Sequence, residues 1–128
     1  MTETLTVSPL QALQQFWEGF GLTAYEENTV PDQALTLNGG KYISYEERRA
    51  GFDEPVAASA SLWYRSRSWT EILAKAEEIF QALQNGGILL PYTGGALWVT
   101  PGAPCYQRMP SETEGVRRVY INVNLEFL

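Results

Sequence analysis

Histidine is absent from the 128-residue sequence, and cysteine occurs once, as Cys105. Without histidine the chain lacks the commonest general base, the commonest transition-metal ligand and the usual partner of a nucleophilic serine. A single cysteine excludes an internal disulfide and a cysteine-built metal cluster. Because no histidine can activate Cys105, we interpret it as a structural thiol. Carboxylate chemistry and magnesium-assisted chemistry remain possible, but they would need a clustered acidic signature, and none is visible in the sequence.

Long apolar runs are also missing, since no stretch approaches the roughly 18 residues that a membrane span requires. The first ten residues, MTETLTVSPL, have neither a basic region nor a long apolar core. We therefore expect no signal peptide, no membrane partner and a cytosolic protein. What the chain does contain is 45% hydrophobic and 12% aromatic residues. This composition can bury a core, and the length fits a single domain over residues 1–128.

Basic residues are scarce in the first half of the chain. Residues 1–54 hold nine Asp and Glu against three Lys and Arg, whereas residues 55–128 hold six of each sign. The net charge of −6 therefore lies entirely in the first half. Such a surface repels nucleic-acid phosphates, so we expect no sequence-specific nucleic-acid binding. We interpret most of this charge as a solvated acidic surface.

The clearest element is the stretch at 68–85, which we predict to be a helix about 25 Å long. Its apolar residues recur at helical spacing and form one stripe, so the helix should lie on an apolar sheet. They are Ile72, Leu73, Ala76, Ile79, Phe80 and Leu83. Ser68 and Glu71 indicate a capping box, and Gly86 and Gly87 should end the helix in the left-handed conformation.

A shorter amphipathic helix is predicted over residues 9–19. Ser8 supplies a cap, and Pro9 suits the first helical position. A short strand at 22–26 and a long connection at 27–40 should follow.

Two alternating segments predict an antiparallel hairpin over about residues 41–66. Ile43 and Tyr45 should share one face, and Tyr42 and Ser44 the other. Small residues on the return strand indicate that the central helix packs closely against it.

The last segment, residues 116–128, is the clearest strand, because apolar and polar residues alternate along it. Before it, residues 96–100 predict a strand, whereas residues 101–110 carry three prolines and predict an irregular or edge segment. We predict an α+β fold: a mainly antiparallel sheet with a long helix packed on one face and a short N-terminal helix.

Carboxylates occur as adjacent pairs, Glu26-Glu27 and Glu46-Glu47. Neighbours on a strand point to opposite faces, so neither pair shares a proton or a metal ion by itself. Solvated charge is the better interpretation of both pairs.

Two serines and four arginines are the other candidates for chemistry. Ser59 and Ser61 share a strand face, but no base lies near them in the sequence. The arginines predict a basic patch or, equally, salt bridges to the acidic first half at a subunit contact. They are Arg65, Arg67, Arg117 and Arg118. We therefore name no catalytic, cofactor-binding or metal-binding residue.

Three segments carry a resemblance to a known family. AYEENTVPDQA at 24–34 closes an acidic segment in a proline loop, and KYISYEE at 41–47 is a tyrosine-rich strand. SLWYRSRSWTEILAKAEEI at 61–79 joins the return strand of the hairpin to the central helix. With the final alternating strand, this pattern resembles the small tail-completion proteins of long-tailed phages and prophages, often labelled tail terminators or minor capsid proteins. The resemblance covers roughly residues 20–128.

The resemblance implies a structural virion assembly protein with a single α/β domain that is not an enzyme and uses no cofactor and no metal. Six copies would form a ring that caps the tail tube and joins it to the head connector. The implied partners are further copies of the chain, the tail tube protein and the connector. The implied location is the tail of the virion, and the host cytoplasm during assembly. A heterologous ring interface needs complementary surfaces, which the acidic first half and the four arginines would supply.

Two alternatives stay open. One is a head–tail joining or stopper protein, and the other is a monomeric small-ligand-binding domain that uses the four Trp and seven Tyr residues. Rings gathered in a concave cluster would favour ligand binding, whereas rings spread through the core and along edges would favour assembly. In a ring through which DNA passes, we expect part of residues 26–54 to face the lumen or the tube, because an acidic lumen repels DNA.

Overall fold

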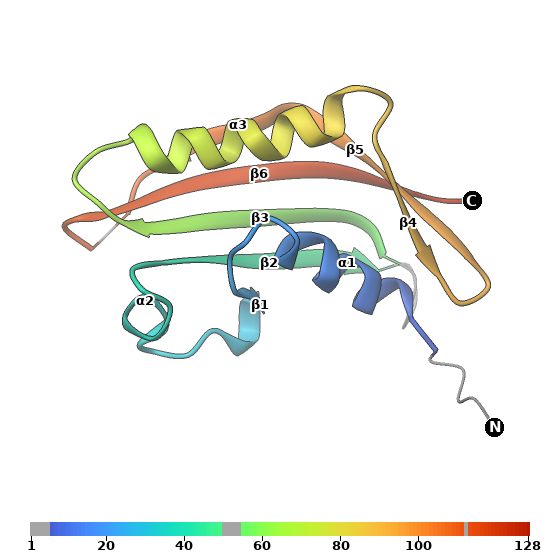
Figure 1. The fold of residues 1–128 in the computed structure, drawn as a ribbon, viewed down its shortest axis with the longest axis horizontal. Helices are drawn as coiled ribbons and strands as arrows, with labels where there is room; N and C mark the ends of the chain where they lie inside the picture. Colours follow the sequence, from blue (N-terminus) through green and yellow to red (C-terminus); the bar gives the residue numbers. More distant parts are fainter. Residues whose placement is uncertain (1–5, 50–54, 112) are drawn as a thin grey trace.

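The fold is α+β and is built on one six-stranded sheet in the order β1-β2-β3-β6-β5-β4 (Figure 1). A computed structural model describes residues 6–49, 55–111 and 113–128. The strands are β1 Ala24–Glu26, β2 Lys41–Arg49, β3 Pro55–Arg65, β4 Ile88–Tyr92, β5 Gly95–Met109 and β6 Val116–Phe127. The helices are α1 Pro9–Glu18, α2 Ala34–Leu37, α3 Thr70–Gln84 and the short 3-10 helix η1 Glu27–Thr29.

The sheet is mixed, which corrects the prediction of a mainly antiparallel one. β1 runs parallel to β2, whereas the remaining neighbours pair antiparallel. A parallel pair needs a crossover connection, and residues 27–40 provide it. The long connection was predicted, but α2 and η1 within it were not, because a four-residue and a three-residue helix leave no periodic pattern.

The predicted hairpin and final strand are confirmed. β2 pairs with β3 so that Ile43 lies opposite Leu62, and β3 pairs with β6 so that Leu62 lies opposite Val119. All three side chains are fully buried. Side chains alternate across a strand, so the same register sends Tyr42 and Trp63 to the other side of the sheet. The predicted hairpin tip at 47–54 lies partly in β2 and otherwise outside the described residues.

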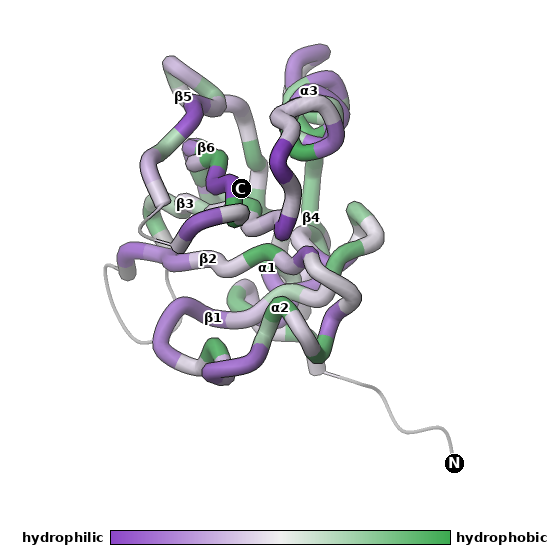
Figure 2. Tube along the Cα trace, turned by 90° about the vertical axis from the view of Figure 1, so that its left-hand side faces the viewer, coloured by the Kyte–Doolittle hydropathy of each residue, from purple (hydrophilic) through white to green (hydrophobic). Residues whose placement is uncertain are grey.

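Both longer helices cover the same side of the sheet. α3 packs over β3, β6 and β5, while α1 contacts β1 and β4, which are the two edge strands. One helix can contact both edges only because the sheet curls around it. Figures 1 and 2 show α3 at the β5 and β6 end of the sheet and the β1–α2 region at the opposite end.

The core lies between these helices and the curled sheet. Leu13 and Trp17 of α1 and Ile72, Ile79 and Leu83 of α3 are fully buried there. Burial of each such side chain contributes roughly 1.5–3 kcal/mol. The predicted apolar stripe of the central helix is thus confirmed, and the predicted N-terminal helix begins at Pro9 with Ser8 and Gln11 forming a capping box.

The central helix begins later and is shorter than predicted, with 15 residues. Its N-cap is Trp69, whose side chain accepts no capping hydrogen bond. Ser68 instead accepts a hydrogen bond from the Thr70 amide at 3.1 Å, so no capping box forms with Glu71. Ser68 therefore caps the first amide of α3, but its own amide bonds Ser66 rather than Glu71, so the reciprocal half of the predicted capping box is replaced.

The end of the central helix follows the prediction. Gly86 and Gly87 both have positive φ, at 88° and 80°. At Gly87 a Cβ atom would lie 2.4 Å from the carbonyl oxygen of Val99, whereas at Gly86 it would meet nothing within 4 Å. Gly87 is therefore required both by its backbone conformation and by the close approach of β5.

The prediction of an irregular or edge segment at residues 101–110 is confirmed in its pairing, although residues 101–109 extend β5. β4 pairs only with Gly95–Val99, so among the described strands this part of β5 pairs with β6 alone. The register with β6 shifts between Pro101 and Tyr106, so Pro104 lies in an irregular stretch, where a missing N–H breaks no ladder hydrogen bond.

Candidate functional surface

The side of the sheet turned away from α1 and α3 carries a row of stacked rings. Tyr25 meets Tyr42 edge-on with ring centroids 5.8 Å apart, and Tyr42 stacks on Trp63 at 6.2 Å with 14° between the planes. The Arg118 guanidinium lies 4.8 Å from the Trp63 ring centroid. We call these four residues the aromatic row. It crosses β1, β2, β3 and β6, and each contact contributes about 0.5–1.5 kcal/mol.

Polar groups beneath the aromatic row already have partners. Ser44 and Ser61 are almost fully buried. Trp63 Nε1 donates to Ser44 Oγ at 2.9 Å, and Arg118 Nε donates to Ser61 Oγ at 3.1 Å. Burial raises the pKa of the Tyr42 hydroxyl, with a smaller contribution from the Glu27 carboxylate. The row is therefore a structural feature of this outer face, with little left for a ligand to bind.

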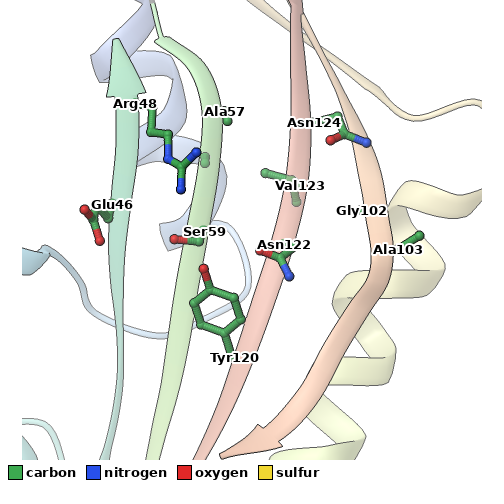
Figure 3. Close-up of a pocket in the computed structure, with 11 residues that line it drawn as sticks. Glu46, Arg48, Ala57, Ser59, Gly102, Ala103, Tyr120, Asn122, Val123 and Asn124 are labelled. Atoms are coloured by element: carbon green, nitrogen blue, oxygen red, sulfur yellow. The ribbon is translucent and has the colours of Figure 1, made fainter.

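A shallow hollow of about 330 Å³ lies farther along the outer face (Figure 3). It exists because Ala57, Ser59 and Gly102 are small. A Cβ atom at Gly102 would lie 2.8 Å from Cβ of Asn122, so β5 and β6 approach too closely there for a side chain. The small residues of β3 thus serve both sides: Ala58 packs in the core below α3, as predicted, while Ala57 opens the hollow.

Polar side chains surround this hollow without forming a reactive pair. Figure 3 shows Arg48 and Tyr120 directed toward the middle of the hollow, where Ser59 lies. Among the described side chains, no hydrogen bond or ion pair joins Glu46 to Arg48. Glu46 lies at the rim, and Glu47 points to the opposite face of β2, as predicted for an adjacent pair. The hollow offers hydrogen-bonding groups but no base for a nucleophile.

The second notable cluster surrounds Trp69 at the start of α3. The Arg108 guanidinium lies 4.9 Å from the Trp69 ring centroid, and that of Arg117 lies 5.1 Å from it. Arg117 Nη2 donates to the backbone oxygen of Arg67 at 2.8 Å. We call Arg67, Trp69, Arg108 and Arg117 the Trp69 cluster. A hollow of about 880 Å³ is lined by three members of this cluster, Arg67, Trp69 and Arg117, together with Ser111 and neighbouring residues.

The predicted patch of four arginines does not form. Arg118 belongs to the aromatic row on the outer face, and Arg65 Nη2 contacts Thr36 Oγ1 at 3.4 Å. Only Arg67 and Arg117 remain together, and Arg108 joins them. No sequence signal linked Arg108 to Trp69, because the contact depends on β5 continuing through its prolines.

The acidic residues nearest the β1 edge lie on η1 and the turn after it. Glu26 accepts hydrogen bonds from the Asn28 amide and side chain at 3.0 and 3.1 Å, so its carboxylate caps η1. Glu27 and Asp32 are exposed. We call Glu27 and Asp32 the acidic tip.

Cys105 lies in the helix-covered half, where it is buried. Burial raises the pKa of its thiol, and the Glu77 carboxylate raises it further. Tyr106 donates to Glu77, which raises the pKa of Tyr106 and lowers that of Glu77. A thiol held protonated is a poor nucleophile, which agrees with the structural interpretation of Cys105.

Exposed apolar side chains gather at the β4 edge. Leu89 and Leu128 are 56% and 63% exposed, and they line an open hollow with Trp98. Trp98 Nε1 donates to the Gly86 oxygen at 2.6 Å, which fixes the ring beside the end of α3. This corner is an open, largely apolar surface, and exposed apolar residues are common on protein surfaces.

Other kinds of site were also sought within the described ranges. There, no group of three or more Cys, Asp or Glu residues could hold a metal ion. In the same part of the chain, no helix has both the length and the apolar character to cross a membrane. Comparisons of the chain with family models, with curated proteins and with solved structures gave no match.

Proposed function

We propose that this chain is a structural assembly subunit, a tail-terminator-like protein of a phage or prophage that forms a homo-oligomeric ring on the tail tube. The phage assignment rests on the sequence resemblance of residues 24–34, 41–47 and 61–79. Its location in the virion tail, and its tail tube and connector partners, are parts of the same proposal. The structure adds one observation, which helps to distinguish an assembly subunit from a ligand-binding domain.

That observation is the distribution of the aromatic rings. Phe16 and Trp17 are buried in the core, while Tyr42 and Trp63 are stacked on the outer face. Other rings lie at edges, such as Tyr92 against Phe127 at 6.0 Å. Among the described residues, no hollow gathers several rings around a concave space. Aromatic rings that pack in the core or stack on the surface of the sheet favour an assembly subunit over a small-ligand-binding domain.

Annular particles provide the test of assembly. The purified chain at increasing concentration would be imaged by negative-stain electron microscopy. We expect rings of uniform diameter with a central opening. Particles of single-subunit size at every concentration would contradict the proposal.

Gene deletion separates the terminator role from the stopper role. In the bacterium that encodes the chain, loss of a terminator leaves tail tubes that grow beyond the normal length. Loss of a stopper leaves tails of normal length that fail to join heads. We expect overlong tubes, and tails of normal length joined to heads would contradict both roles.

A further inference from the structure

We propose that the Trp69 cluster receives the acidic tip, Glu27 and Asp32, of a second copy of this chain. The proposal deepens the assembly function proposed above and rests on it. It names which arginines and which carboxylates meet at a head-to-tail contact between subunits.

The Trp69 cluster has several donors, and its one described hydrogen bond to an acceptor in its own chain runs from Arg117 Nη2 to the backbone oxygen of Arg67. Arg67 and Arg108 are exposed, and no described hydrogen bond or ion pair engages either guanidinium. Arg117 has a buried Nε with no described hydrogen-bond partner. A buried N–H left without an acceptor costs about 1–3 kcal/mol, so an acceptor supplied by another molecule would be stabilising at this position.

The start of α3 adds to the attraction for negative charge. The helix is 15 residues long, and the Trp69 side chain next to its first turn does not cap it. Amides at a helix N-terminus carry a partial positive charge. Ser68 already accepts from the Thr70 amide, and Glu71 lies in the first turn, so most of the attraction comes from the guanidinium groups. Arg67 and Arg117 line one hollow with Trp69, while Arg108 contacts the Trp69 ring, and the planar guanidinium fork suits a carboxylate.

Glu114 is the described carboxylate that lines the hollow beside these arginines, and it is exposed and makes no described ion pair with them. Glu71, two residues after Trp69 in the first turn of α3, is a second described carboxylate, and two carboxylates do not balance three guanidinium groups. The cluster therefore keeps a local positive charge on a chain whose net charge is −6.

The chemistry of the whole chain favours a second copy over a nucleic acid as the occupant. A chain of net charge −6 repels a phosphate backbone, and the positive charge is confined to this cluster. The chain itself provides the complementary group. Glu27 and Asp32 are exposed carboxylates, and no described ion pair engages either of them.

The two surfaces are separated, so their contact must be between different molecules. The acidic tip follows β1 at one edge of the sheet, while Arg117 lies on β6, three strands away. At about 4.8 Å per strand, that is roughly 14 Å across the sheet. In Figures 1 and 2 α3 lies at the β5 and β6 end of the sheet and the β1–α2 region lies at the opposite end. Contact between two different patches is heterologous, and repetition of it generates a ring or a filament.

A charge swap tests this contact. Arg108→Glu is preferred to Arg117→Glu, because Arg117 also bonds the Arg67 backbone and its loss would disturb the fold. The partner variant is Asp32→Lys, and the third variant carries both changes. Arg48→Glu and Glu126→Lys make the same charge changes elsewhere on the surface and serve as matched controls.

Sedimentation velocity at low salt measures the self-association of each full-length variant. We expect each single reversal to weaken the association constant about tenfold or more, and the double swap to restore it to within a few-fold of the wild type. The two controls should each change it by less than about threefold. High salt should weaken the wild type.

The outcomes distinguish a failure of the proposed contact from a failure of the proposed assembly function. A wild type that forms rings while neither Arg108→Glu nor Asp32→Lys weakens them overturns the contact and leaves the assembly function standing. Equal weakening by Arg48→Glu would assign the effect to net charge and would also overturn the contact. A wild type that stays monomeric at every concentration overturns both proposals.

Discussion

The two faces of one sheet are stabilised by different kinds of contact. On the side under α1 and α3, Trp17, Ile79 and Val119 are fully buried and the contacts are apolar. On the outer face, Trp63 stacks between Tyr42 and Arg118, and the buried serines are bonded to their neighbours. The first face derives its stability from area removed from water. The second combines ring contacts with hydrogen bonds, and the short helix α2 contacts part of it, with Thr36 beside Arg65 and Asn38 bonded to Tyr25.

This difference explains how the chain can be stable and still have surface available for assembly. The helix-covered face is filled with buried apolar side chains, so it offers no surface for a partner to bind. Free charges lie instead at the margins, in the Trp69 cluster and the acidic tip. Self-assembly at those margins would leave the core unchanged.

The largest loss of stability is expected from a cavity in the helix-covered face. Ile79→Ala should lower the free energy of unfolding by about 2–5 kcal/mol, because Ile79 is fully buried between α3 and the sheet. The control is Leu89→Ala, at a side chain that is 56% exposed, with an expected change of less than about 0.5 kcal/mol. Urea denaturation would measure both. Equal losses would show that the two sites are not buried as described.

The next largest effect should come from the turn that leads the chain from α3 to β4. Gly87→Ala should cost about 2–3 kcal/mol, because its new Cβ would lie 2.4 Å from the Val99 oxygen at a positive φ. Gly86→Ala shares the positive φ but meets no atom within 4 Å, so it should cost only about 1 kcal/mol. Thermal denaturation of the pair would compare them. A smaller loss for Gly87→Ala than for Gly86→Ala would contradict the close approach of β5.

On the outer face, replacing Trp63 by the smaller Phe removes one hydrogen bond together with part of the stacked ring. Trp63→Phe should cost about 1 kcal/mol, because the buried Ser44 hydroxyl loses its donor at 2.9 Å. Tyr120→Phe removes a hydroxyl with no described partner and should change stability by less than about 0.5 kcal/mol. Urea denaturation measures both variants. An unchanged midpoint for Trp63→Phe would mean that the bond contributes nothing to the aromatic row.

The smallest expected effect at neutral pH belongs to Tyr64, on the helix-covered face. Burial, with contributions from the Glu71 and Glu78 carboxylates, raises the pKa of Tyr64 to about 12. A raised folded-state pKa gives stability that is fully present below the ordinary pKa of 10.0 and is lost as pH rises toward about 12. Tyr64→Phe cannot ionise, so its stability should fall less steeply over that window. Denaturation at a series of alkaline pH values would measure both slopes, and identical slopes would contradict the burial of the hydroxyl.

The sequence predicted correctly those elements that depend on residues close together in the chain. The Ser8 cap, the alternation of residues 116–128 and the apolar stripe of α3 each depend on residues close in sequence, and all three are present. What failed depends on distant contacts. The parallel pairing of β1 is set by a crossover, and β5 continues past the irregular residues 102–105 because β6 pairs with it again from Tyr106.

The same limit applied to the candidate surface. Four arginines close in sequence suggested one patch, but alternation along β6 sends Arg117 and Arg118 to opposite faces. Arg108 reaches Trp69 only through the register of β5 and β6, which no single segment encodes. Charge composition indicated an acidic half and a few arginines, and only the tertiary structure showed which of them are left without partners.

The most direct test of the assembly proposal is the molar mass of the chain in solution, measured by light scattering on a sizing column over a series of concentrations. One subunit has a mass of 14.4 kDa. The account predicts that the mass rises with concentration to one discrete multiple of this value and stops there, as a closed ring requires. A mass that remains at a single subunit throughout the series would contradict it.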